Sequence, residues 1–203
     1  DGLVKAAAKD GQPAVAVTDL SNLFGAVKLY SAARKKGVQP IIGADVWIEP
    51  EESGKTPTRL LLLIQNRQGY LRLCELLGEA WTAPGQRSHA WVHWASLAAN
   101  NAGLICLSGA DLGSIGQALI NGDAAKAEAQ ATRLAETFPG RFYIELQRAG
   151  HPTNETHIRG AVPLAAKLGL PVVATHPIQF STPADFEAHE ARTCIAEGET
   201  LSN

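Results

Sequence analysis

The sequence has little of three features that would reveal a function at once: cysteine, excess positive charge and long apolar runs. Its three cysteines, Cys74, Cys106 and Cys194, are far apart, and each lies in an apolar run. An odd, scattered set suits a reducing compartment better than a disulfide framework, and it predicts small core side chains. Lysine and arginine total 18 against 20 aspartates and glutamates, a formal net charge of -2. Because no positive field attracts phosphates, DNA binding by this chain alone is not expected.

No apolar stretch reaches the roughly 18 residues that a membrane-spanning helix requires. The chain opens with Asp1 and Gly2 instead of the basic and apolar regions of a secretion signal. We therefore predict a cytoplasmic protein with no membrane partner. The length of 203 residues predicts a single domain, 1–203, because domains usually run about 100 to 200 residues.

Short runs rich in Val, Ile and Leu alternate with longer helical patterns. Six runs predict strands at 14–18, 40–48, 59–65, 103–108, 141–147 and 171–175. Their near-continuous apolar character is typical of parallel strands covered on both faces. Six patterns predict helices at 22–36, 66–79, 114–120, 123–138, 154–168 and 184–197. Pro163 is expected to kink or divide the fifth helix. The alternation predicts an α/β barrel or a doubly wound sheet.

Two local patterns leave alternatives open. Gly109, Gly113 and Gly116 follow a strand and open a helix, so their amides offer a phosphate cradle, but tight-turn geometry explains the same glycines. His89 and His93 are four residues apart and would share a helix face as metal ligands, although no third ligand stands at a useful spacing. An aromatic surface loop that binds a partner would explain the histidine segment equally well.

Polar residues stand at the carboxyl ends of two predicted strands. Thr18 and Asp19 end the first strand, and Thr175 and His176 end the last. Parallel barrels place their active sites at these ends. The pattern therefore points to a site at a barrel mouth, with few groups there that can bind a metal.

Six blocks of the sequence carry a resemblance to a known family, in the family's order: 13–23, 37–45, 66–70, 107–110, 142–148 and 170–175. Together they resemble the PHP (polymerase and histidinol phosphatase) domain of bacterial DNA polymerase III alpha subunits. The resemblance implies an α/β fold, a distorted (βα)7 PHP barrel with a trinuclear metal site at the strand ends. The family's first strand, with its His-x-His pair, belongs ahead of Asp1. We therefore expect a barrel truncated of its first strand, with an exposed parallel edge.

The first three metal positions that the resemblance implies are largely replaced. Where metal-binding members have Thr-Asp-His, this chain has Thr18-Asp19-Leu20, and leucine cannot bind a metal. Where they have Gly-x-Glu, it has Gly43-Ala44-Asp45, which keeps a shorter carboxylate. Arg59 stands where they have a histidine before the third strand, and a guanidinium has no lone pair to donate.

The remaining positions are replaced in the same way. Ala110 stands where metal-binding members have cysteine or histidine after Leu-Ser-Gly. Their final Asp-x-His corresponds here to Pro177 and Gln179 flanking an isoleucine, with His176 in place of the preceding asparagine. Only Asp45, helped by His176, remains able to bind. The resemblance thus implies a pseudo-enzyme with no catalytic residues, no metal and no cofactor.

Arg59 is expected to take over the electrostatic role of the lost metals. Asp45 and Asp19 are predicted at the same end of the barrel, where two carboxylates without a cation would repel each other. A guanidinium can bind both through paired, charge-assisted hydrogen bonds.

The resemblance also implies partners. They are the proofreading exonuclease subunit, which the domain would dock as a scaffold, and the remainder of the polymerase alpha subunit. The nucleotidyltransferase site would lie outside this chain, so DNA would be reached only through the full polymerase. The alternative function is an active metal-dependent phosphoesterase or 3'-5' proofreading exonuclease that uses Asp45, His176 and the first-strand histidines. A nucleotide-binding protein built on 109–116 is a third interpretation.

Overall fold

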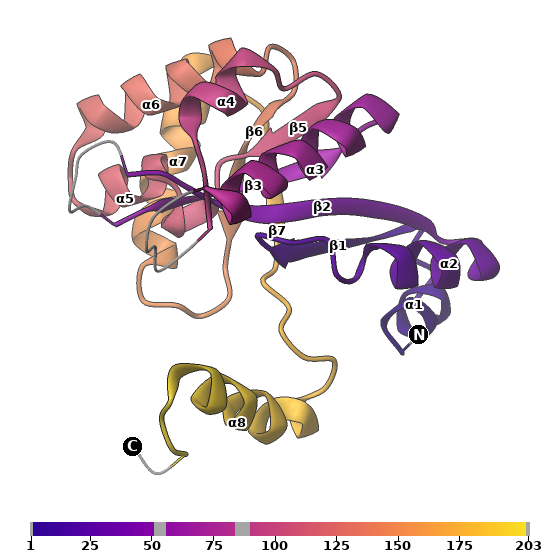
Figure 1. Ribbon diagram of the computed structural model, residues 1–203. Helices are drawn as coiled ribbons and strands as arrows, with labels where there is room; N and C mark the ends of the chain where they lie inside the picture. The colour runs from indigo at the N-terminus through magenta and orange to yellow at the C-terminus, as the bar shows by residue number, and fades with distance from the viewer. Residues whose placement is uncertain (1, 51–55, 84–89, 202–203) are drawn as a thin grey trace.

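The molecule has an α/β fold built on one curled β-sheet, which carries most of the helices on one side (Figure 1). The computed structural model describes residues 2–50, 56–83 and 90–201. The strands run in the order β1-β2-β3-β5-β6-β7, and β4 pairs with β2. Their bounds are β1 Ala14–Leu20, β2 Gln39–Ile48, β3 Thr58–Ile64, β4 Trp91–Val92, β5 Leu104–Leu107, β6 Phe142–Gln147 and β7 Val172–Thr175.

The helices mostly alternate with these strands. They are α1 Gly2–Lys9, α2 Ala26–Lys36, α3 Arg67–Thr82, α4 Trp94–Ala99, α5 Ser114–Ile120, α6 Ala124–Thr137, α7 Asn154–Leu168 and α8 Phe186–Glu197, with 3-10 turns η1 Ala110–Leu112 and η2 Pro183–Asp185. The predicted start and stop signals hold at α3, where Asn66 Oδ1 accepts a hydrogen bond from Gly69 N at 3.1 Å. They hold also at α2, which ends at Gly37 with a φ of 70°.

All six predicted strands and six predicted helices are present, with ends shifted by a few residues. The predicted division at Pro163 is wrong, because α7 is one continuous helix. Pro163 lies on the exposed side of this helix, where water can hydrogen-bond to the carbonyl that proline leaves without a partner. The structure adds α1, α4 and the short β4, which the apolar pattern did not predict.

The direction of β3 is a second correction. β1 and β2 are parallel, as are β5, β6 and β7, but β3 is antiparallel to both β2 and β5. Only residues 49–57 connect β2 to β3, and a parallel crossover needs about a dozen residues or more. The chain therefore turns back. As a result, the start of β3 lies at the same edge of the sheet as the carboxyl ends of β1 and β2.

The two faces of the sheet differ in burial. On the outer face, Val46 and Leu62 are fully buried and belong to one core with Leu73 and Leu76 of α3. On the inner face, Asp45, Trp47, Leu61 and Leu63 are only half buried. The expectation of strands covered on both faces is therefore wrong for this pair of strands, and the core lies between the sheet and its helices.

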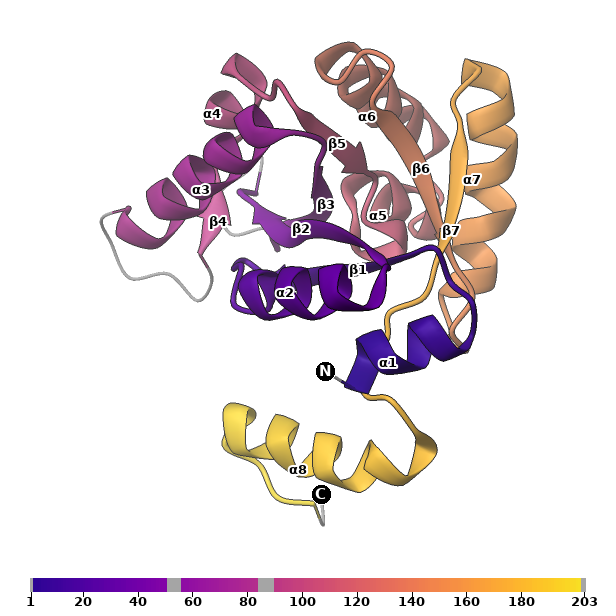
Figure 2. The same cartoon turned by 90° about the vertical axis from the view of Figure 1, so that its right-hand side faces the viewer.

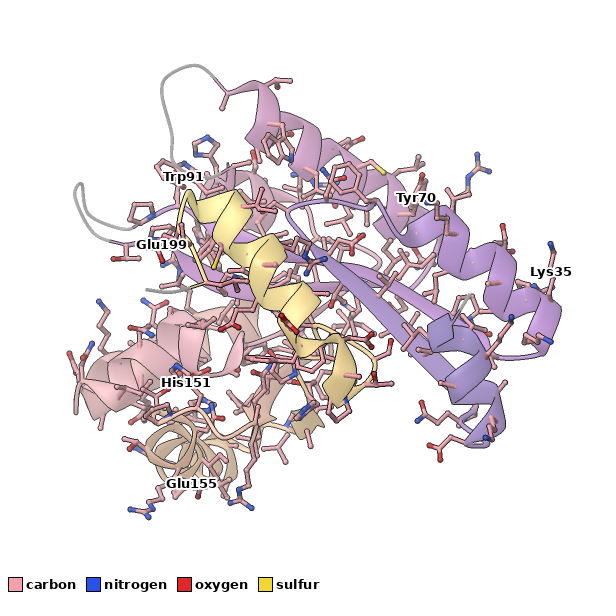
Figure 3. The ribbon with its side chains drawn as sticks, turned by 90° about the horizontal axis from the view of Figure 1, so that it is seen from below. Lys35, Tyr70, Trp91, His151, Glu155 and Glu199 are labelled. Atoms are coloured by element: carbon pink, nitrogen blue, oxygen red, sulfur yellow. The ribbon has the colours of Figure 1, made fainter. Side chains whose placement is uncertain are left out.

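The sheet is open, as expected for an incomplete barrel. In the described part of the chain, β1 and β7 each pair with one neighbour only. After β7 the chain leaves the sheet, and α8 lies apart from it, across its carboxyl edge (Figures 1 and 3). Phe180 packs against Phe186 at a ring distance of 5.8 Å at the start of this helix. None of the described helices combines the length and apolarity needed to cross a bilayer.

Candidate functional site

Polar side chains gather on the inner face of the sheet, near the carboxyl ends of the parallel strands. Alternation along each strand decides which residues share this face. Asp45 and Trp47 alternate with buried Ala44 and Val46, and Arg59 lies directly opposite Trp47 in the β2–β3 register. The same rule places Glu145 and Gln147 of β6 together, with Thr175 of β7 opposite Gln147. We call these the inner-face polar residues: Asp45, Arg59, Glu145, Gln147 and Thr175.

Arg59 and Asp45 form a two-pronged ion pair. Arg59 Nε donates to Asp45 Oδ1 at 2.7 Å, and Arg59 Nη2 donates to Asp45 Oδ2. The guanidinium also lies over the ring of Trp47, 4.6 Å from its centroid. The side chains of Arg59 and Asp45 are only 16% and 26% exposed. The expected pairing of Arg59 with Asp45 is therefore confirmed, and β3 makes it possible by running antiparallel.

Asp19 does not share this ion pair, and that part of the expectation is wrong. Asp19 lies opposite Ala44 in the β1–β2 register, which places it on the outer face. There its Oδ2 accepts a hydrogen bond of 2.6 Å from the backbone N of Gly25, just before α2. The adjacent Leu20 pairs with Asp45 instead and occupies the inner face, 49% exposed. An aliphatic side chain therefore stands beside Asp45.

The other expected positions are dispersed. Ala110 is buried in η1, at a φ of 47°, and offers only a methyl group. His176, Pro177 and Gln179 are exposed on the segment that leads from β7 to η2. The structure thus brings Asp45, Arg59 and Leu20 together, but it does not assemble the remaining positions around them.

Glu145, a buried carboxylate that is not among the predicted site residues, lies at the other end of the inner face. Glu145 is 3% exposed. Its Oε1 accepts from Thr175 Oγ1 at 2.5 Å and from Gln147 Nε2 at 3.1 Å, and its Oε2 accepts from Gly109 N at 3.1 Å. Its backbone N donates to Ser108 Oγ at 2.9 Å. Glu145 therefore ties β6 to β7 and to the turn after β5.

Burial has an electrostatic consequence for Glu145. It raises the pKa of the carboxyl above its usual range, and the negative charge of Asp45 adds to the rise, although hydrogen bonds from Thr175, Gln147 and Gly109 oppose it. The sequence signal for this residue was a single acidic side chain inside an apolar strand. It was missed because the residue belongs to none of the expected metal positions.

The glycine segment after β5 does not form a phosphate cradle. A Cβ at Gly109 would lie 2.2 Å from Arg59 O, and one at Gly113 would lie 1.8 Å from Ser108 O. Gly109 N is used by Glu145, and Gly113 N donates to Gly109 O at 2.9 Å. Close backbone packing thus requires these glycines, as the tight-turn interpretation predicted.

His93 is held by a carboxylate rather than presented to a metal. Its Nδ1 lies 2.6 Å from Glu49 Oε2, and Glu49 Oε1 accepts from Trp94 N at 2.8 Å. Glu49 therefore fixes the start of α4. The possible pairing of His93 with His89 involves a residue outside the described part of the chain.

The donor set on the inner face does not fit the trinuclear metal site that the family implies. Asp45 offers a carboxylate, but both of its oxygens accept from Arg59. Glu145 offers another, but both of its oxygens accept hydrogen bonds as well. Among the described residues, no three His, Cys, Asp or Glu side chains converge as metal ligands. Several anionic or imidazole donors are needed to hold such metals. On this face the Arg59 guanidinium, a cation, is paired with Asp45 instead.

Comparison with known proteins gives a family and close relatives. Residues 1–149 match the PHP domain family. Over 99% of its length the chain is 46% identical to the DNA polymerase III subunit alpha of Pseudomonas aeruginosa and 39% identical to that of Escherichia coli. The chain spans only 17% of the length of each of these relatives.

A solved structure supports the fold independently. An amidohydrolase from Chromobacterium violaceum, determined with bound sulfate and no metal, superposes with a TM-score of 0.59 at 15% identity. The match covers 93% of this chain and 89% of the amidohydrolase. At this identity the similarity concerns the fold alone, and it supports the curled α/β architecture described above.

Proposed function

Since this chain belongs to the PHP domain family, we propose that residues 1–203 form one PHP domain at the amino-terminal end of a replicative DNA polymerase III alpha subunit. It acts there, in the cytoplasm, as a metal-free scaffold that docks the separate proofreading exonuclease subunit during DNA replication. The domain itself is not catalytic. DNA is bound and extended by the remainder of the alpha subunit, a nucleotidyltransferase.

One observation carries the metal-free part of this proposal: the ion pair between Arg59 and Asp45. A phosphoesterase of this type needs metal-activated water at the strand ends. Here a guanidinium holds the carboxylate that would bind the metal, and Leu20 lies beside it. The positive charge of Arg59 also repels a metal cation, so metal binding is less favourable here than at a carboxylate with no cationic partner.

The docking part rests on similarity and on charge. Relatives that match over 99% of this chain are DNA polymerase III alpha subunits. The net charge of -2 does not suit independent binding to DNA. A domain that has neither metal chemistry nor strong affinity for DNA is best explained as a platform for another protein.

Metal analysis tests the first part. The full-length protein that carries this chain is purified, and zinc, manganese and iron are measured by elemental analysis after dialysis against each ion. We expect residues 1–203 to bind less than one metal ion per molecule and to show no phosphodiesterase activity. An established zinc protein carried through the same steps controls for loss of metal. Two or more bound metals that disappear on Asp45→Ala substitution would instead support the active phosphoesterase or exonuclease.

Calorimetric titration tests the second part. The cognate proofreading exonuclease is titrated into the full-length protein and into a version that lacks residues 1–203. We expect binding to the first and none to the second. Equal binding to both would place the docking site outside this chain and end the scaffold proposal.

A further inference from the structure

The outward side of α2 carries apolar residues that the fold does not use. Phe24, just before the helix, is 82% exposed, Val27 is 77% exposed and Tyr30 is 52% exposed. A spacing of three residues places Val27 and Tyr30 next to each other on one side of the helix, with Phe24 one turn earlier. We call these three residues the α2 stripe. Contiguous exposed apolar side chains on a folded domain mark an interaction site more often than isolated ones.

The inward side of α2 is already satisfied. Ala26, Leu29 and Ala33 are buried, and the latter two form a small core with Val4 of α1 and Val38. Figure 2 shows α2 in front of β1, with no other described element covering its outward side. The α2 stripe is therefore not required for the packing of α2 on the sheet.

Another exposed aromatic residue is tied to the segment that precedes the helix. Trp81, at the end of α3, is 61% exposed, and its indole Nε1 donates to Ser21 O at 2.8 Å. This bond fixes the Trp81 ring beside the turn that leads from β1 to Phe24. An ordered aromatic ring contributes contact area with little further loss of side-chain entropy on binding.

The same helix is strongly basic. Residues 2–37 contain six lysines or arginines against two aspartates, whereas the whole chain has a net charge of -2. Four of these cations lie on α2: Lys28, Arg34, Lys35 and Lys36. Within the described residues, none of the four forms an ion pair, and Figure 3 shows Lys35 at the end of α2 on the outside of the molecule. The stripe is thus flanked by positive charge without a partner.

We propose that the α2 stripe is the docking surface for an acidic, amphipathic helical segment of the proofreading exonuclease subunit. The inference rests on the proposed function and adds the place and the chemistry of the contact. Apolar side chains of the segment, spaced three and four residues apart, pack on Phe24, Val27 and Tyr30. Its carboxylates face Lys28 and the basic end of α2, which speeds association and fixes the direction of the segment.

The geometry favours a helix of a protein over single-stranded nucleic acid. Nucleic acid usually follows a positive groove whose aromatic side chains stack with successive bases. The α2 stripe is instead the convex side of a helix, with an aliphatic residue, Val27, at its centre. Ridges of this kind pack into the grooves of another helix.

The test compares two glutamate substitutions at equally exposed apolar positions. Val27→Glu places a carboxylate at the centre of the α2 stripe, and Ile195→Glu does the same on α8, where Ile195 is 82% exposed. Both are made in the full-length protein, and the purified cognate exonuclease is titrated into each. We expect Val27→Glu to weaken binding at least about tenfold, the effect of losing one central apolar contact of roughly 1.4 kcal/mol. Ile195→Glu should bind like the wild type.

A charge reversal gives a second, independent readout. Lys28→Glu should weaken binding at low salt, and the difference from the wild type should shrink as salt screens the charges. Circular dichroism should show that all three variants are folded, because each changed side chain is exposed.

Each outcome bears on a separate claim. If the wild type does not bind the exonuclease, the proposed function fails. If the wild type binds and Val27→Glu binds equally well, the function stands and the α2 stripe is not the docking surface. If Val27→Glu instead abolishes binding of a single-stranded oligonucleotide, or dissociates a dimer of the protein, while exonuclease binding is unchanged, the surface serves nucleic acid or self-association and the inference is overturned.

Discussion

The stabilising effect of the Arg59–Asp45 ion pair can be measured directly by a double-mutant cycle. The cycle comprises Arg59→Ala, Asp45→Ala and the double variant, with the free energy of unfolding obtained from urea titration followed by circular dichroism. The double variant removes both charges, so the cycle isolates the coupling between the two side chains from the effect of each truncation.

The magnitude follows from the geometry and the burial. Exposed ion pairs contribute about 0 to 1 kcal/mol, and removing one partner of a fully buried pair costs about 3 to 5 kcal/mol. The side chains here are 16% and 26% exposed and share two hydrogen bonds, so we expect a coupling of about 2 kcal/mol. Arg59→Ala also loses the contact with the Trp47 ring, worth about 0.5 to 1 kcal/mol. The single substitution should therefore cost about 3 kcal/mol, which lowers the Tm by about 6 to 12 °C for a chain of this size.

A matched control exists on the surface. Arg148 also binds a glutamate, Glu155, through Nε and Nη2, but the two side chains are 70% and 52% exposed. Arg148→Ala should therefore destabilise the chain far less than Arg59→Ala. A coupling for Arg59 and Asp45 below about 0.5 kcal/mol, in the range of exposed pairs, would refute the argument that the guanidinium stabilises this end of the sheet in place of a metal.

Three further predictions concern other parts of the structure. Gly69→Ala should destabilise the chain by about 3 kcal/mol in urea titration, because its Cβ would lie 1.9 Å from Gly103 O. Gly78→Ala in the same helix is the control: a Cβ there has nothing within 4 Å, so the substitution should be neutral or stabilising by up to about 1 kcal/mol. Because burial raises the pKa of Glu145, the folded state binds this proton more tightly than the unfolded chain, so stability should fall as pH rises from about 4.3 through the raised value. Glu145→Gln should flatten that slope in unfolding titrations between pH 4 and 7, and parallel slopes would contradict the assignment. Burial also raises the pKa of the Cys106 thiol, so a thiol reagent should label Cys106 only in denaturant, and labelling in the native protein would show that this part of the core opens.

Much of the fold follows from local patterns in the sequence. The apolar runs predict the strands because β2, β3, β5 and β6 bury apolar residues in the core. Gly37 and Gly169 mark helix ends because only glycine adopts a positive φ without strain. The direction of β3 was missed because an apolar run looks the same in parallel and antiparallel strands. The information lay in the connection, since residues 49–57 are too few for a crossover.

Only part of the candidate site was predicted correctly from the sequence. Arg59 and Asp45 were expected to meet because both stand at metal positions that the family resemblance implies, and they do. Asp19 was expected with them, but proximity along the chain does not decide the face of a strand. Its neighbour Leu20 takes the inner face, so Asp19 must point outward to Gly25. Glu145 was overlooked because its partners, Thr175 and Gly109, are distant in the sequence and meet only through the pairing of three strands.

The Arg59–Asp45 ion pair also favours the correct alignment of β3 on β2 over shifted alignments. Arg59 faces Asp45 only while Trp47 lies opposite it. A slip of β3 by one residue would turn every side chain of the strand to the other face. Arg59 would then enter the apolar core beneath α3, and Leu60 and Leu62 would lose their places there. A misaligned hairpin would thus bury an unpaired charge, at a cost of several kcal/mol. Arg59 and Asp45, which pair near the edge of the sheet, therefore favour a single alignment of the two strands.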